Sequence, residues 1–426
     1  MRKILILCPT KREFRDLPDL AERLGYELLF DEFGDDYFDR FLGNEPDPDG
    51  EHLDILSLID DTIQRYKNAG LAGVTSGVGY PGMSASSIIA RELGLPGPEP
   101  EAIILLDHKY ASRLAQQKFV PDATPNFHLI DPHDPDSTLA VKDFPIFLKP
   151  VKSCMSKNAY LVNSATKLQE RVRSSLLPEG FIRPFNDMVR TYTKFPHHAS
   201  YLMVESLLQG NQVSLEGYVF AGKVHVMGIF DALFFPGTIS FKRFQYPSKL
   251  AETVQERMIG IAETLLSGVG YDNAPFNIEL MYNATTDAIH IIEVNPKLAS
   301  QFPDLFKKVD GTSSYSVLLQ LAVGEEPTFT QRQGDFKLAG SCVLRSFEDK
   351  RVLGIPSAEQ IDRLKGDFPD ALVEIYAPLG KNLSDQMQDS ASFRYGLVNI
   401  GADSERELEE KFEHFKHSLD FQFAPV

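Results

Sequence analysis

The stretch Pro275–Lys297 carries a strand–turn–strand pattern that strongly restricts the possible folds of this chain. Two runs with strand composition, Phe276–Asn283 and Ala288–Pro296, flank a short polar turn at Thr285–Asp287. The first run contains Phe, Ile and Tyr, and the second contains three Ile and one Val, all residues that favour strands. The stretch therefore predicts an antiparallel β-hairpin.

Strand side chains alternate between two faces, which sorts the residues of this hairpin. One face of the first strand is expected to carry Asn277, Glu279 and Met281, and one face of the second is expected to carry Ile289, Ile291, Glu293 and Asn295. With the three-residue loop Thr285–Asp287, Glu279 lies directly opposite Glu293. A two-residue loop would place Glu293 on the other face, because a one-residue slip turns every side chain over.

Two carboxylates facing each other across a ladder repel one another, so the pair calls for a cation. Glu279, Glu293 and the amide oxygen of Asn295 form an oxygen-only set of the kind that suits Mg²⁺, with phosphate oxygens and water completing the shell. Lys297 follows two residues later. The alternative interpretation is an ordinary amphipathic hairpin whose carboxylates lie on its solvated face.

Composition limits the classes of partner and compartment. The chain has 426 residues and a net charge of −17, which argues against nucleic acid or an anionic membrane as its main partner. It has no apolar run of the roughly 18 residues that a membrane span needs. The cysteines are few, far apart and without metal spacing, which indicates reduced thiols in a cytoplasmic protein: Cys8, Cys154 and Cys342.

The N-terminal part alternates predicted strands and helices, which is typical of a parallel sheet in an α/β domain. The expected strands are Lys3–Cys8, Tyr26–Phe30 and Leu71–Thr75, and the expected helices are Leu17–Leu24, Leu53–Ala69 and Ser84–Leu93. The segment Gly77–Gly82 (GVGYPG) lacks the full glycine spacing of a dinucleotide fingerprint. We interpret it as a tight strand-to-helix turn that can line a substrate pocket at the strand ends.

Two lysines precede the hairpin, and one of them, Lys149, lies in a position that suits phosphate. Lys109 lies on a helix expected over Glu101–Phe119, and Lys149 ends the expected strand Phe144–Pro150. The polar loop Ser153–Lys157 follows, and such a loop can cradle phosphates with its backbone N–H groups. The alternative for Lys149 is an ordinary solvated strand end. Farther along, Phe235–Pro247 reads as an aromatic and basic loop.

With these residues in this order, the chain resembles the ATP-grasp carboxylate–amine ligases over nearly its whole length. The resemblance implies an ATP-grasp fold of α/β class (α+β overall). Its expected divisions are an N-terminal α/β domain at 1–100, a grasp domain at 101–330 with halves 101–203 and 204–330, and a small α+β domain at 331–426 like that of the amino-acid ligase branch.

The resemblance also implies roles for residues. Two Mg²⁺ ions, with Mn²⁺ as an alternative, are held by Glu279, Glu293 and Asn295, while Lys109 and Lys149 contact the phosphates of ATP. Glu205 and the backbone through Leu208 receive adenine. The chain departs from the family in three places. Lys297 replaces the usual Arg and lacks its planar guanidinium group. Gln212 replaces the acidic residue expected to bind the ribose hydroxyls, and the loop Ser153–Lys157 contains no glycine.

The implied activity is ATP-dependent joining of a carboxylate to an amine through an acyl phosphate, with Lys297 as the catalytic cation and amino-acid-like small molecules as substrates. A homodimer is compatible with this interpretation. One alternative is a non-catalytic ATP-binding protein with a regulatory or scaffold role, suggested by Lys297 and by the loop without glycine. Another is a ligase of a specialised pathway, which joins an amino acid to a non-peptide acid or an enol-type ring. Gly77–Gly82 and the aromatic segment Phe234–Tyr246 are expected to help select the substrate.

Overall fold

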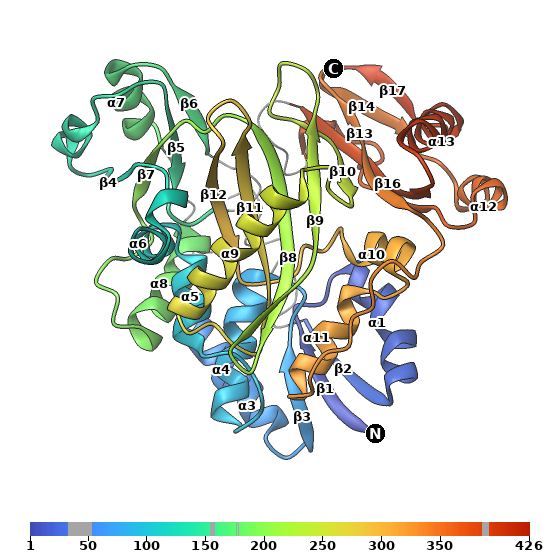
Figure 1. The fold of residues 1–426 in the computed structure, drawn as a ribbon, viewed down its shortest axis with the longest axis horizontal. Coiled ribbons are helices and arrows are strands. Elements are labelled where there is room, and N and C mark those ends of the chain that lie inside the picture. Colours follow the sequence, from blue (N-terminus) through green and yellow to red (C-terminus); the bar gives the residue numbers. More distant parts are fainter. Residues whose placement is uncertain (33–52, 154–157, 176, 178, 386–391) are drawn as a thin grey trace.

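The structure is a computed structural model that describes residues 1–426 apart from 33–52, 154–157, 176, 178 and 386–391. The described strands form sheets of three, eight, two and four strands. Figure 1 shows the eight-stranded sheet through the middle of the molecule, with the four-stranded sheet on one side. Helices and strands are mixed throughout, which confirms the predicted class. In the described part of the chain, no helix is long and apolar enough to cross a membrane.

A parallel three-stranded sheet in the order β2-β1-β3 begins the chain. Its elements are β1 (Arg2–Leu7), α1 (Lys11–Leu24), β2 (Tyr26–Asp31), α3 (Ile55–Tyr66), β3 (Leu71–Thr75) and α4 (Ser84–Glu92). The predicted alternation of strands and helices is confirmed. Helix α1 begins earlier than the expected Leu17, because Thr10 and Glu13 form a capping box at its start.

Two helices replace the single helix expected over Glu101–Phe119. They are α5 (Pro100–Asp107) and α6 (Lys109–Phe119). His108 separates them with an extended backbone, and its ring Nδ1 accepts a hydrogen bond from the backbone N–H of Ala111 at 3.2 Å. This side-chain cap satisfies a donor of the first turn of α6. Lys109 consequently stands at the first position of a helix rather than inside one.

The four-stranded antiparallel sheet has the order β4-β7-β5-β6. Its elements are β4 (Phe127–Ile130), β5 (Ile146–Pro150), β6 (Tyr160–Val162), α7 (Ala165–Arg173), α8 (Glu179–Tyr192) and β7 (Leu202–Ser206). Helix α8 was not expected, because Gly180 and Pro184 are poor helix formers. The boundary expected between 203 and 204 falls inside β7, and the domain boundaries remain a prediction.

The eight-stranded sheet has the order β12-β11-β8-β9-β10-β13-β16-β15. Its strands are β8 (Asn211–Phe220), β9 (Lys223–Phe234), β10 (Phe241–Tyr246), β11 (Ala274–Asn283), β12 (Ala288–Asn295), β13 (Leu338–Ser346), β15 (Leu372–Ile375) and β16 (Phe393–Ala402). The expected loop Phe235–Pro247 is therefore wrong over β10, which pairs with β9 and β13. Three of the six residues of β10 are aromatic (Phe241, Phe244 and Tyr246), which suits a strand between two neighbours.

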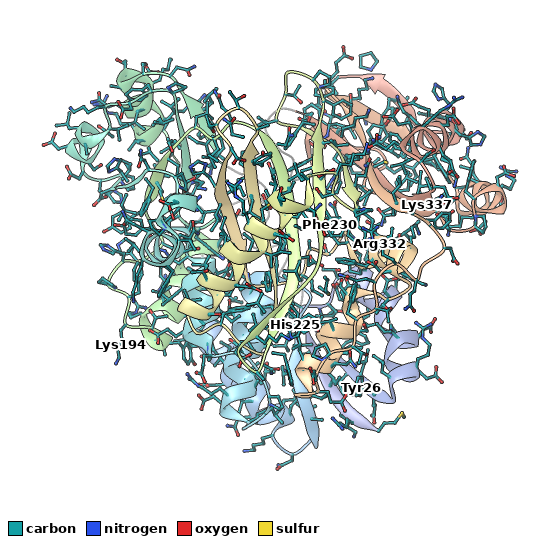
Figure 2. All side chains as sticks on the ribbon, viewed as in Figure 1. Tyr26, Lys194, His225, Phe230, Arg332 and Lys337 are labelled. Carbon is teal, nitrogen blue, oxygen red and sulfur yellow. The ribbon has the colours of Figure 1, made fainter. Side chains whose placement is uncertain are left out.

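The remaining elements lie outside this sheet. They are α9 (Glu252–Gly268), α10 (Pro303–Asp310), α11 (Ser314–Ala322), β14 (Lys350–Gly354), α12 (Ala358–Asp367), α13 (Glu405–Ser418) and β17 (Gln422–Pro425). Two of them, β14 and β17, pair with each other in a separate two-stranded sheet. Phe230 of β9 lies near the centre of the molecule (Figure 2) and is fully buried. Its ring stacks on Phe302 at 3.7 Å between centroids, which joins the sheet to the segment preceding α10.

Candidate active site

The predicted hairpin exists, and Glu279 of β11 pairs directly with Glu293 of β12. The turn differs from the expected three residues, because Asn283 pairs with Ala288 and leaves four residues between the strands. A β-bulge restores the expected opposition: Leu280 pairs with Ile291, so Ile292 is an extra residue before Glu293. The carboxylate pair was thus predicted correctly from a turn that was predicted wrongly.

The bulge also changes which side chains share a face with Glu293. Ile289 and Ile291 were expected beside it, but they lie in the core cluster that includes helix α9. Figure 1 shows α9 across one face of β11 and β12. The extra residue reverses the alternation of side chains, so Glu293 and Glu279 lie on the face opposite α9.

Both lysines predicted to reach phosphate form ion pairs with carboxylates of the site. Lys109 Nζ lies 2.7 Å from Glu293 Oε1, and Lys149 Nζ lies 2.8 Å from Glu205 Oε2. The four residues line one small cavity together with Arg113. Burial lowers the pKa of Lys149, and Glu205 opposes that shift by favouring the charged ammonium. The structure thus brings these residues together although they come from four different elements.

The two facing carboxylates differ in their affinity for protons. Burial, and then the charge of Glu293, raise the pKa of Glu279 to about 7. Burial acts in the same direction on Glu293, but Lys109 and Lys149 outweigh it and lower the pKa of that carboxyl. A carboxylate whose ionisation is opposed by its neighbour is a ligand that a divalent cation would stabilise. The donor set therefore fits Mg²⁺.

The remaining predicted residues lie around this pair. Asn295 pairs with Asn277 across the hairpin. Gln212 donates a hydrogen bond from Nε2 to Oε2 of Glu279 at 3.0 Å. Gln212 therefore contacts one of the two facing carboxylates directly. Leu208 is half-buried in the segment between β7 and β8. Of the loop Ser153–Lys157, residues 154–157 lie outside the described residues.

The turn at Gly77–Gly82 is packed tightly, which explains its glycines without a dinucleotide. A Cβ on Gly79 would lie 2.9 Å from Cδ of Lys297, and a Cβ on Gly77 would lie 2.2 Å from Oε1 of Glu13. A Cβ on Gly82 would lie 2.1 Å from Oγ of Ser76. The turn therefore lies directly against the side chain of Lys297.

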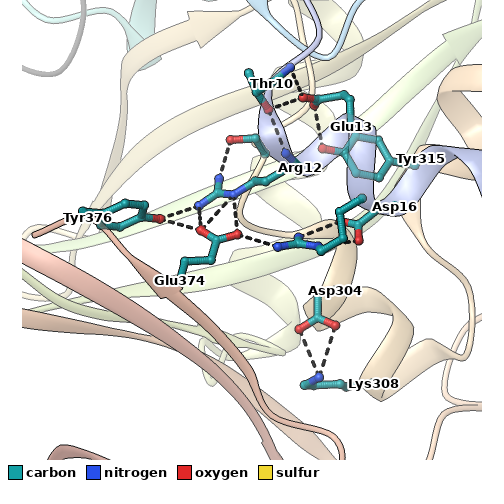
Figure 3. A network of polar contacts seen from close by, with 11 residues as sticks. Thr10, Arg12, Glu13, Asp16, Asp304, Lys308, Tyr315, Glu374 and Tyr376 are labelled. Atoms are coloured by element: carbon teal, nitrogen blue, oxygen red, sulfur yellow. Dashed lines mark hydrogen bonds and ion pairs between the residues drawn. The ribbon is translucent and has the colours of Figure 1, made fainter. Parts of the chain in front are cut away.

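Arg12 joins the first helix to the C-terminal part and to the segment after Lys297 (Figure 3). Its guanidinium donates to both carboxylate oxygens of Glu374, to Oγ of Ser300 at 2.7 Å and to the hydroxyl of Tyr376 at 2.9 Å. These partners lie far from Arg12 along the chain, so no local sequence pattern connects them.

Two buried charged residues were also missed. Arg113, on α6, is 2 % exposed and forms an ion pair with Glu205 at 2.6 Å. Glu216, on β8, is fully buried, and its Oε2 accepts hydrogen bonds from the backbone N–H of Ala299 at 2.7 Å and from Nδ2 of Asn277 at 3.2 Å. The only available signal was a charged residue within an otherwise apolar pattern, which is too common to assign a role.

Comparison with known proteins gives a family match over the middle of the chain. The family described as "ATP-grasp domain" matches residues 142–302. An uncharacterized protein of Sinorhizobium fredii is 25 % identical over 373 residues, which cover 87 % of this chain and 72 % of that protein. Both Glu279 and Glu293 lie within residues 142–302, which the family matches.

Solved structures share the fold over the full length. The L-amino acid ligase from Bacillus licheniformis has a TM-score of 0.73 and 19 % identity, covering 100 % of this chain and 99 % of that one. Phosphoribosylglycinamide synthetase from Anaerococcus prevotii has a TM-score of 0.65 and 15 % identity, covering 99 % of each chain. A biotin carboxylase from Campylobacter jejuni, in a β-γ-ATP complex, has a TM-score of 0.66 and 13 % identity, covering 100 % of this chain and 93 % of that one. Residues 142–302 thus match the ATP-grasp domain family, and the whole chain shares its fold with these three enzymes.

Proposed function

We propose that this protein is an ATP-dependent ligase that joins a carboxylate to an amine through an acyl phosphate. The observation that carries the proposal is the facing pair of Glu279 and Glu293, with Lys109 paired to Glu293 at 2.7 Å and Lys149 close by. Such an arrangement suits polyphosphate and divalent cations, which neutralise each other's charge. The fold shared with known ligases supports the same activity.

Glu279, Glu293 and Asn295 would hold the Mg²⁺ ions. Bound Mg²⁺ would offset the negative charge of the triphosphate and of the group in transfer. Gln212 keeps Glu279 in place through its hydrogen bond, since the carboxylate oxygen that accepts it cannot rotate freely. Two ions, rather than one, are proposed because the resemblance to the ATP-grasp ligases implies two.

Lys109 and Lys149 would contact the phosphates of ATP. Each now lies against a carboxylate, and each can exchange that partner for a phosphate oxygen without leaving the cavity that they share. The backbone N–H groups at the start of α6 add a positive end beside Lys109. The side chain of Glu205 is fully engaged by Arg113 and Lys149, so adenine recognition falls to the main chain through Leu208.

Lys297 would hold the reacting carboxylate. The substrate oxygen attacks the γ-phosphorus of ATP, the bond to the β-phosphate oxygen breaks, and ADP leaves. The amine then attacks the acyl carbon, gives up a proton, and the C–O bond to phosphate breaks. The chain's contribution is to position the groups and to supply positive charge rather than to provide a nucleophile.

Steady-state phosphate release tests the proposal. Purified protein with ATP and Mg²⁺ is given pairs of carboxylates and amines, starting with amino acids because of the shared fold with an L-amino acid ligase. Phosphate release that requires both substrates, with a mass spectrum of the joined product, would support the ligase. Binding of ATP with no turnover across a broad panel would instead favour a regulatory or scaffold role.

The second candidate is a ligase for a specialised acid or an enol-type ring. It is favoured by Lys297, which has a single ammonium where the family usually has the planar guanidinium of Arg. An ammonium restricts the orientation of a bound carboxylate less than a guanidinium does. The same panel separates the two candidates if it includes aromatic and non-peptide acids. A homodimer and a cytoplasmic location stay predictions.

A further inference from the structure

Arg113 is a buried arginine whose three donor groups reach β7, β12 and its own helix α6. Its Nε donates to Oε1 of Glu205 at 2.6 Å, and its Nη1 donates to Oε1 of Gln116. Its Nη2 donates to the backbone carbonyl of Ile292 at 2.7 Å. With only 2 % of its surface exposed, this side chain holds one fixed position.

The carbonyl that Arg113 contacts belongs to the extra residue of the β-bulge. A bulge leaves one residue outside the ladder of its strand, and a buried carbonyl needs a donor from elsewhere. β12 is the edge strand of the eight-stranded sheet, so no further strand of that sheet can supply it. Arg113, on α6, provides the missing donor for Ile292.

The position of this bulge determines where the next side chain points. Glu293 follows Ile292 and lies opposite Glu279 because of the extra residue. Without it, the alternation set by Ile289 and Ile291 would turn Glu293 toward the core beneath α9. The same guanidinium also fixes Glu205, which is the ion-pair partner of Lys149.

We propose that Arg113 is a positioning residue of the metal site, which stabilises the bulged register of β12 and thereby keeps Glu293 facing Glu279. This inference rests on the proposed function, because it takes the facing carboxylates as the metal ligands. The hydrogen bonds of Arg113 go to Glu205, Gln116 and Ile292. The effect of Arg113 on the metal is transmitted through the carbonyl of Ile292 and one residue of backbone.

Metal binding tests the inference without requiring turnover. Mn²⁺ is titrated by calorimetry into the full chain in the presence of adenylyl imidodiphosphate, a non-hydrolysable ATP analogue. Arg113→Lys keeps the charge beside Glu205 but lacks the fork that reaches Ile292 at the same time. We expect it to weaken Mn²⁺ binding about tenfold, as removal of a residue that orients a metal ligand typically does.

Arg257→Met is the matched control, because Arg257 also contacts the hairpin backbone. Its Nη2 donates to the carbonyl of Asp287 at 2.7 Å, but at the exposed turn rather than at the bulge. We expect Mn²⁺ binding within twofold of the unchanged protein. Thermal melting is measured for both variants, and a lower melting temperature with unchanged Mn²⁺ affinity is the signature of a purely structural role.

The outcomes separate the inference from the proposed function. Folded Arg113→Lys protein that binds Mn²⁺ within twofold of the unchanged chain would overturn the role of Arg113 and leave the metal site standing. An unchanged chain that binds no Mn²⁺ with the analogue would overturn the metal site itself. If Arg113→Lys does not fold, hydrogen exchange on the unchanged chain decides. The inference then requires the amide protons of β12 near Ile292 to be protected as strongly as those of β11, and rapid exchange there would overturn it.

Discussion

Glu279 and Glu293 lie directly opposite each other across two neighbouring strands, yet their pKa values shift in opposite directions. The difference arises from their other neighbours: Glu293 is in contact with Lys109, whereas Glu279 accepts a hydrogen bond from the neutral Gln212. The two carboxylates are therefore not equivalent as metal ligands. Glu293 is the one that remains ionised most readily.

Glu293→Gln is expected to abolish metal-dependent turnover while leaving the fold intact. An amide is a much weaker ligand for Mg²⁺ than a carboxylate, and its shape is almost the same. Phosphate release and thermal melting are measured together, with Glu263→Gln on the exposed face of α9 as the control. Activity close to that of the unchanged protein at ordinary Mg²⁺ concentrations would show that the site is assigned to the wrong residues.

Gly79→Ala is expected to impair catalysis more than stability. The new methyl group would meet the flexible stem of Lys297 at 2.9 Å, and the stem can move aside and take the ammonium with it. We expect the KM of the carboxylate substrate to rise severalfold, with thermal melting little changed.

Gly77→Ala is the matched comparison. Its methyl group would meet Oε1 of Glu13 at 2.2 Å, and that buried carboxylate is held by Tyr315 at 2.6 Å and by Thr10. Because Glu13 cannot move aside, we expect a loss of about 1–3 kcal/mol in the free energy of unfolding. Equal effects of the two substitutions on KM and on stability would contradict the contact between the turn and Lys297.

Glu216→Gln is expected to change how stability depends on pH. Burial raises the pKa of Glu216 to about 8 from the model-peptide value of 4.5. Between these values the unfolded chain loses the proton and the folded chain retains it, so this group makes the protein less stable as the pH rises. The slope is about 1.4 kcal/mol per pH unit for one proton.

Chemical denaturation at pH 5, 6, 7 and 8 checks this prediction. The glutamine side chain retains an oxygen for the bonds from Ala299 and Asn277 but has no proton to lose. The stability of the variant, relative to the unchanged protein, should therefore increase over this range. If the difference in the free energy of unfolding between Glu216→Gln and the unchanged protein stayed constant with pH, Glu216 would be ionised in the folded protein.

Arg12→Met is expected to destabilise the protein by about 2 kcal/mol at neutral pH, because it leaves the largely buried Glu374 without its main partner. Burial opposes ionisation of Glu374, but Arg12 outweighs it and lowers the pKa of Glu374 to about 2. The ion pair therefore stabilises the fold above about pH 4.5 and is lost as the pH falls toward 2.

Denaturation at pH 7 and pH 3 measures this contribution. The difference in the free energy of unfolding between Arg12→Met and the unchanged protein should be smaller at pH 3 than at pH 7. Arg406→Met removes a solvent-exposed pair with Glu410 and should change the free energy of unfolding far less than Arg12→Met does at pH 7. If Arg12→Met lowered the free energy of unfolding at pH 7 by no more than the control does, the network in Figure 3 would not contribute to stability.

Local patterns were sufficient to predict the hairpin and the N-terminal sheet. They rest on alternation and on turn residues, which act over a few neighbouring positions. The bulge at Ile292 lies beyond such patterns, because its stability depends on Arg113 from a distant helix. His108 was likewise read as an ordinary helical residue, although its ring acts as a cap.

Residues that act across the chain were missed for the same reason. Arg12 and Glu374 are separated by 362 positions, and nothing near either one indicates the other. β10 was read as a loop because its aromatic residues are explained only by the strands on both sides of it. Sequence patterns thus located the chemical groups, whereas the contacts that orient them required the fold.

The pairing of β10 with β13 has a consequence for attempts to divide the protein. A chain cut ahead of Leu338 would lose β13 and leave β10 as an open edge carrying Phe241 and Phe244. An unpaired apolar edge of this kind recruits strands from other molecules and leads to aggregation. A shortened version made of the grasp halves alone is therefore a poor starting point for crystallisation or engineering, and the full chain is the smallest practical unit.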